Sequence, residues 1–97
     1  MKMTKTERAD LDKCTALAKR IRAAERLSDR PADIVLNAST LLTFERTMAG
    51  RQDQARPSEV REVLELRLND PAGYKARVER SRPAAGMYGL DAVLARR

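Results

Sequence analysis

The stretch that decides the fold is Leu11-Asp-Lys-Cys-Thr-Ala-Leu-Ala-Lys-Arg-Ile21. Its apolar residues recur at intervals of three, four and three positions, at Leu11, Cys14, Ala18 and Ile21. This spacing places them on one face of an α-helix. Either Thr4 or Thr6 can cap the start of that helix, and Glu7 follows Thr4 three residues later as in a capping box. The residue before Pro31 is biased against helix, so we predict one long amphipathic helix over residues 5–28.

A second helix is predicted over residues 31–49, with Pro31 in its first turn and Gly50 at its C-terminal end. Residues 34–44 form the longest uncharged run of the chain, eleven residues. A helix that is apolar around most of its circumference is usually contacted from several sides. We therefore expect the second helix to be the central, uncharged one.

Three more helices are predicted over residues 57–69, 71–81 and 90–96, and a proline opens each of the first two. The polar connector 50–56 is the best candidate for a mobile loop. No segment alternates apolar and polar residues over the length of a strand. The 97 residues therefore predict one all-α domain, a small bundle of four to five helices.

Composition argues against catalysis. The chain has no His, which removes the usual general base and the commonest metal ligand. Its single cysteine, Cys14, lies on the apolar face of the first helix and is expected to be a buried small side chain. Arg67 falls by phase on the apolar face of the helix over residues 57–69, which is an anomaly. We expect a protein that is not an enzyme and needs no metal or cofactor.

Size and composition also bear on location and assembly. No run of eighteen apolar residues is present, no apolar signal region follows the first methionine, and one cysteine cannot form an internal disulfide. We therefore expect a cytoplasmic protein. A chain this short, with one Phe and no Trp, builds a thin core, so we expect a homo-oligomer.

Basic residues supply the candidate binding surface. The chain has 20 Lys and Arg against 14 Asp and Glu, a net charge of +6 that attracts phosphate backbones and acidic partners. One group lies opposite the apolar face of the first helix within about 80° of arc, extended by Arg8, and a second lies around the fourth helix. The candidate nucleic-acid-binding residues are Lys19, Arg22, Arg26, Arg30, Lys75, Arg77, Arg80 and Arg82. The same spacing is also typical of a solvated helix face.

Three functions stay open. Net charge favours a small basic protein that contacts nucleic acid mainly through phosphates. The alternative is a protein-interaction module, an adaptor, assembly factor or inhibitor of the kind that phages and plasmids encode, docking on a larger acidic protein. Its anchor would be the apolar residues Met87, Tyr88, Leu90, Val93 and Leu94. The third is an oligomer that sequesters an anionic small ligand between basic side chains of two subunits.

Overall fold

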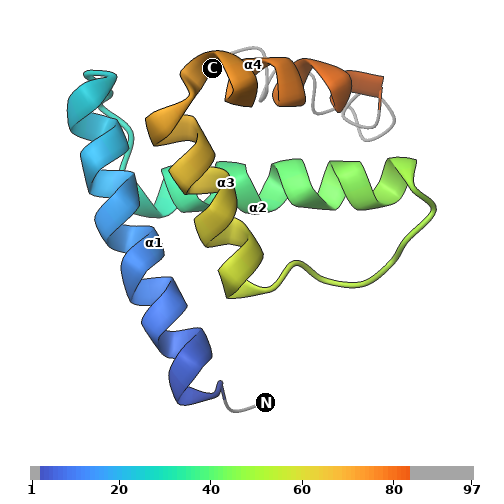
Figure 1. Ribbon diagram of the computed structural model, residues 1–97, viewed down its shortest axis with the longest axis horizontal. Helices are drawn as coiled ribbons and strands as arrows, with labels where there is room; N and C mark the ends of the chain where they lie inside the picture. The colour runs from blue at the N-terminus through green and yellow to red at the C-terminus, as the bar shows by residue number, and fades with distance from the viewer. Residues whose placement is uncertain (1–2, 84–97) are drawn as a thin grey trace.

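The computed structural model describes residues 3–83, which form four α-helices (Figure 1). They are α1 (Lys5–Ala24), α2 (Pro31–Met48), α3 (Pro57–Asn69) and α4 (Pro71–Arg80). The prediction of an all-α fold is confirmed. The helix predicted over residues 90–96 lies outside the described part of the chain. None of the four helices combines the length and the apolar composition that crossing a bilayer requires.

In Figure 1, α1 and α3 run from bottom to top, and α2 and α4 run across them. α1 and α3 lie side by side, run in the same direction and share the most extensive interface. α2 passes behind α3, and α4 lies across the far end of α3. α3 packs extensively against all three other helices, whereas α2 does so only against α1 and α3. The prediction that the second helix is the central one is therefore not confirmed, since α3 has the larger share of the interfaces.

One side of α2 faces outward although the residues of its uncharged run, 34–44, form most of it. Leu36 on this side is 61% exposed. The hydroxyls of Thr40, Thr43 and Thr47 each donate a hydrogen bond of 2.9–3.1 Å to the carbonyl four residues earlier. Because the helix itself satisfies these hydroxyls, they need no hydrogen-bond partner outside α2.

The core lies where α1, α2 and α3 meet, and α4 closes one end of it. Its buried side chains are Cys14, Ala18, Ile21, Ile34, Ala38, Leu41, Leu42, Phe44, Val60, Val63, Leu64, Tyr74 and Val78. Cys14 is fully buried, as predicted, and its thiol lies 3.7 Å from the carbonyl oxygen of Pro57. Burying a side chain such as Phe44 or Ile34 stabilises the fold by about 1.5–3 kcal/mol.

α1 ends at Ala24, earlier than predicted, because a Schellman motif closes it. The amide of Leu27 donates to the carbonyl of Arg22 over 3.0 Å, and the amide of Arg26 donates to that of Ala23 over 3.4 Å. Arg26 has a φ of 54°, a left-handed conformation that non-glycine residues seldom adopt. The motif turns the chain so that Leu27 packs against the core.

The same motif closes α2, this time with glycine. Gly50 has a φ of 71°, and its amide donates to Thr47 over 3.1 Å. The amide of Arg51 donates to the carbonyl of Arg46 over 2.8 Å. Gly50 therefore ends α2 as predicted.

Candidate nucleic-acid interface

Ion pairs divide the basic residues of the structure into two groups. The arginines of α2 and α3, which are Arg46, Arg61 and Arg67, all have carboxylate partners. By contrast, within residues 3–83 no ion pair involves a basic residue of α1. Among the residues that the structure describes, no salt bridge thus compensates the positive charge of α1.

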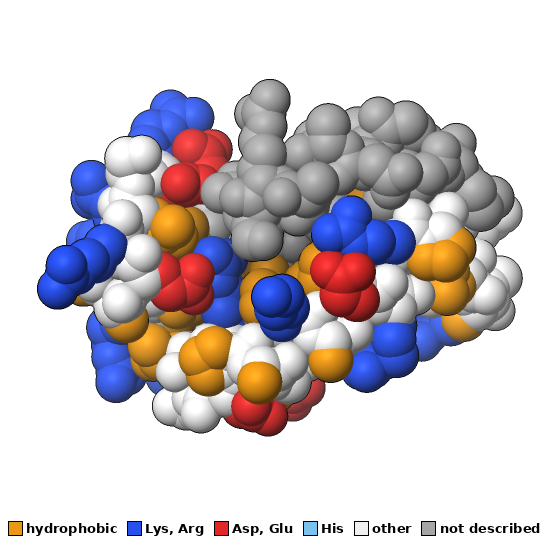
Figure 2. Space-filling view, turned by 90° about the horizontal axis from the view of Figure 1, so that it is seen from above, with side chains coloured by type: hydrophobic (Ala, Val, Ile, Leu, Met, Phe, Trp, Pro, Cys, Tyr) orange, Lys and Arg blue, Asp and Glu red, His pale blue; other side chains and the backbone are white. Residues whose placement is uncertain are grey.

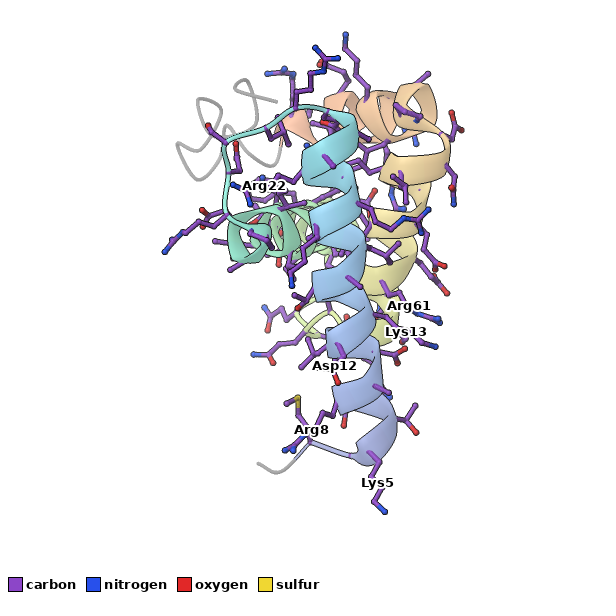
Figure 3. The ribbon with its side chains drawn as sticks, turned by 90° about the vertical axis from the view of Figure 1, so that its left-hand side faces the viewer. Lys5, Arg8, Asp12, Lys13, Arg22 and Arg61 are labelled. Atoms are coloured by element: carbon purple, nitrogen blue, oxygen red, sulfur yellow. The ribbon has the colours of Figure 1, made fainter. Side chains whose placement is uncertain are left out.

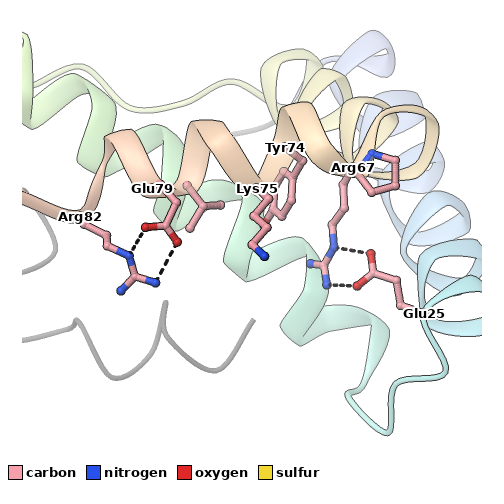
Figure 4. Close-up of a pocket in the computed structure, with 8 residues that line it drawn as sticks. Glu25, Arg67, Tyr74, Lys75, Glu79 and Arg82 are labelled. Carbon is pink, nitrogen blue, oxygen red and sulfur yellow. Dashed lines mark hydrogen bonds and ion pairs between the residues drawn. The ribbon is translucent and has the colours of Figure 1, made fainter.

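Arg67 resolves the anomaly noted in the sequence. Its side chain is only 4% exposed, and its Nε and Nη2 each donate a 2.9 Å hydrogen bond to the carboxylate of Glu25 (Figure 4). Its Cζ lies 5.1 Å from the ring centroid of Tyr74, a cation–π distance. Burial works to lower the pKa of Arg67, but the bonds to Glu25 and the nearby Tyr74 outweigh it, and the pKa is raised. Arg67 therefore belongs to the interior as a charged, paired residue.

Arg46 and the connector after α2 form a second network, in which a buried guanidinium meets partly exposed carboxylates. The Arg46 side chain is 7% exposed; its Nε donates to Asp53 over 3.1 Å and its Nη2 donates to Glu59. Arg51 donates to the same Asp53 carboxylate. The connector over residues 50–56, predicted to be a mobile loop, is therefore tied to both α2 and α3.

Three of the predicted phosphate-binding arginines have carboxylate partners in the structure. Arg77 donates to Glu45 of α2 over 2.6 and 2.8 Å. The other two form local pairs three residues apart, Arg82 with Glu79 and Arg30 with Asp33. In the predicted cluster around the fourth helix, Arg77 and Arg82 are therefore paired with carboxylates, and Lys75 and Arg80 are the bases without an ion pair within residues 3–83.

A groove of about 250 Å³ runs beside α4 (Figure 4). It is lined by Glu25, Arg67, Pro71, Tyr74, Lys75, Val78, Glu79 and Arg82. Lys75 extends between the Arg67–Glu25 pair and the Arg82–Glu79 pair, and within residues 3–83 it forms no ion pair itself. The two pairs neutralise the other two bases of the groove, so Lys75 supplies the one uncompensated charge of its lining.

The outer face of α1, the exposed side opposite its buried residues, concentrates the remaining bases (Figure 3). It carries Lys5, Arg8, Asp12, Lys13, Lys19, Arg20 and Arg22. Figure 2 likewise shows Lys and Arg side chains gathered along the edge on which α1 lies. The predicted residues Lys19 and Arg22 lie on this face, and Arg26 follows just beyond the helix.

The acidic residues of α1 are mostly engaged elsewhere. Glu7 forms the predicted capping box with Thr4, each side chain accepting a bond of 3.1 Å from the other residue's amide. Asp10 is 8% exposed and pairs with Arg61 of α3, whose Nε lies 3.2 Å from its Oδ1. Asp12 is thus the one acidic side chain on the outer face of α1.

Sequence reasoning missed Lys13 and Arg20. With Arg61 and Glu65 of α3 they line a groove between α1 and α3. Their spacing of seven residues is the signal that could have found them, because residues seven apart lie on nearly the same side of a helix. The outer face of α1 is therefore broader than the single ridge predicted from the sequence.

Within residues 3–83, the structure shows neither a cluster of metal ligands nor an exposed thiol. Residues 3–83 contain no group of three or more His, Cys, Asp or Glu side chains that could hold a metal ion. Burial, with the nearby negative charges of Asp10 and Glu65, raises the pKa of the Cys14 thiol, and Arg61 opposes this shift. The thiol is therefore held in its protonated, less nucleophilic form.

The predicted partner-binding residues Met87, Tyr88, Leu90, Val93 and Leu94 lie outside the described residues. Comparisons of the chain with known protein families, with curated proteins and with solved structures found no match.

Proposed function

We propose that this protein is a non-catalytic nucleic-acid-binding protein that contacts phosphates through the outer face of α1. The observation that carries the proposal is the division of the basic residues. Those of α1 form no ion pair within residues 3–83, whereas the arginines of α2 and α3 do. An exposed base without a carboxylate partner contacts a phosphate without first giving up a salt bridge.

Phosphate contacts set the expected behaviour. Each contact releases condensed counterions, so log K should fall with log salt by about 0.9 for each phosphate neutralised on B-form DNA. Phosphates carry no sequence information, so binding should show little sequence preference. Lys75 and Arg80 of α4, the other predicted bases without an ion pair in the described chain, should contribute weakly, since α4 offers no comparable concentration of charge.

The test is fluorescence polarisation of labelled DNA, duplex and single-stranded, at low salt. The variant Lys19→Gln/Arg22→Gln removes two charges from the outer face of α1, and Lys75→Gln/Arg80→Gln removes the same two residue types from α4. We expect the first variant to weaken binding by about tenfold or more and the second by about twofold. The proposal fails if the unmodified protein does not bind at micromolar concentration. It also fails if the two variants weaken binding equally, because net charge alone would then explain the affinity.

A further inference from the structure

We propose that α1 enters the major groove of double-helical DNA, so that the protein prefers a B-form duplex to a single strand. The proposal rests on the proposed function and names the substrate class of the same surface.

Five of the six bases of α1 form two lines along the helix, and the sixth, Lys5, lies between them in the first turn. At about 100° per residue, one line falls within about 60° of arc and the other within about 20°, and their centres are about 140° apart. The first line is Arg8, Lys19 and Arg22, and the second is Lys13 and Arg20. Figure 3 looks onto α1 from outside and shows Arg8 and Arg22 on one side of the helix and Lys13 on the other, beside Arg61. A single strand offers one line of phosphates, whereas the walls of a duplex groove offer two.

The strip between the two lines carries three alanines, with Lys5 and Asp12 on its side nearer the first line. Ala9, Ala16 and Ala23 follow one another at intervals of seven residues between the two lines of bases, and all three are exposed. Methyl groups along this ridge allow the helix backbone to approach the floor of a groove while the flanking bases reach the phosphates. Exposed alanines alone do not indicate a binding surface; these do so because bases flank them on both sides.

The diameter of α1 matches the width of the major groove of B-form DNA. An α-helix with its side chains is about 10–12 Å across, and the major groove of B-form DNA is about 12 Å wide. α1 forms one edge of the molecule, and its outer side is free of the other three helices (Figure 1). The major groove of A-form RNA is too deep and narrow for such a helix, so an RNA duplex should bind less well than a DNA duplex.

The two lines are not equal in charge. On the side of Lys13 and Arg20, Arg61 is paired with Asp10, and Glu65 lines the same groove. On the side of Arg8, Lys19 and Arg22, three bases face a single nearby acid, Asp12. No ion pair within residues 3–83 holds Asp12. The line of Arg8, Lys19 and Arg22 should therefore supply the larger share of the affinity.

The experiment compares three labelled probes of equal length, about two helical turns, with the full chain at one salt concentration. The probes are a DNA duplex, one of its strands, and an RNA duplex. We expect the DNA duplex to bind about tenfold or more tightly than either other probe. If no probe binds, the proposed function itself fails. If the single strand or the RNA duplex binds as tightly as the DNA duplex, entry into the major groove is wrong while phosphate binding stands.

A substitution in the ridge tests the geometry without changing charge. Ala16→Leu places a bulky, helix-favouring side chain between the two lines, and Ala76→Leu makes the same change at an exposed position of α4. We expect Ala16→Leu to weaken binding to the DNA duplex by about fivefold and to leave single-strand binding unchanged, while Ala76→Leu changes neither. Circular dichroism verifies that both variants stay folded. Unchanged duplex binding by Ala16→Leu, or equal loss on both probes, overturns the proposal.

Discussion

The guanidinium of Arg67 donates two hydrogen bonds of 2.9 Å to the carboxylate of Glu25, joining the last turn of α3 to the C-cap residue of α1. Tyr74 of α4 lies against the same guanidinium. Three helices thus meet at one buried charge. The pair also fixes where α1 ends relative to α3, and therefore how the outer face of α1 is presented.

Removing the carboxylate of this pair should destabilise the protein. Glu25→Ala leaves the charge of Arg67 buried without its partner, and we expect a loss of about 2 kcal/mol. This is less than for a fully buried pair, because the Glu25 side chain is 35% exposed. Urea unfolding followed by circular dichroism measures the change. Glu79→Ala is the matched control, since its partner Arg82 is 37% exposed and little change is expected there. Equal stability of the two variants would contradict the role given to Arg67.

The two Schellman motifs predict opposite responses to glycine. Arg26 holds a left-handed conformation that glycine adopts without strain, so Arg26→Gly should stabilise the protein by about 0.5–1 kcal/mol. Gly50→Ala introduces that strain and should destabilise it by about 1 kcal/mol. Arg22→Gly replaces arginine by glycine inside α1, where glycine is unfavourable, and should lower the free energy of unfolding by about 1 kcal/mol. Thermal unfolding of the three variants measures the effects, and destabilisation by Arg26→Gly would show that its side chain is needed at that position.

The Arg46 network predicts loss of stability in acid. Arg51, together with Arg46, lowers the pKa of Asp53 below its ordinary 3.8, and the backbone amide of Arg56, with Arg46, lowers that of Glu59 below 4.5. A carboxylate whose pKa is lower in the folded state stabilises the fold fully above its ordinary pKa. That contribution is lost as the pH falls through the lower, folded value. Stability should therefore decline progressively below about pH 4.5.

Urea midpoints between about pH 3 and 6 measure this dependence. Glu59→Gln should make the acid decline shallower, because it removes one of the two carboxylates. Glu62→Gln, at an exposed position of the same helix, should leave the decline unchanged. An unaltered profile in Glu59→Gln would mean that other carboxylates cause the acid sensitivity.

Asp12 should weaken the binding of nucleic acid. It is the one acidic side chain on the outer face of α1, so it repels phosphates that approach Arg8 or Lys19. We expect Asp12→Asn to raise the affinity for duplex DNA by about threefold at low salt, with a smaller gain at higher salt. Glu62→Gln changes net charge equally on α3 and serves as the control in the same polarisation titration. If both variants gain equally, the phosphates do not lie near Asp12.

Local signals in the sequence were enough to predict where the helices begin. Pro31, Pro57 and Pro71 each stand at the first position of a helix, and Thr4 caps α1 through Glu7 as its spacing predicts. The end of α1 was missed because Arg26 in a left-handed conformation breaks the preference for glycine on which such predictions depend.

The pairing of charges could not be predicted, because it depends on contacts between distant segments. Arg67 meets Glu25 across 42 positions of sequence, and Arg77 meets Glu45 across 32. Helical phase places Arg67 on an apolar face but gives no indication of its partner. The phosphate-binding surface predicted from composition therefore included arginines that the fold pairs with carboxylates.

Paired and unpaired bases should differ in how many substitutions their positions tolerate. Substituting Arg46, Arg67 or Arg77 disturbs contacts between helices, so these positions should tolerate few replacements. Lys19 and Arg22 form no ion pair with another helix within residues 3–83, so other helix-favouring residues should replace them with little effect on folding. The outer face of α1 is therefore free to vary in charge, so the affinity for nucleic acid that we propose for it can be tuned separately from the stability of the scaffold.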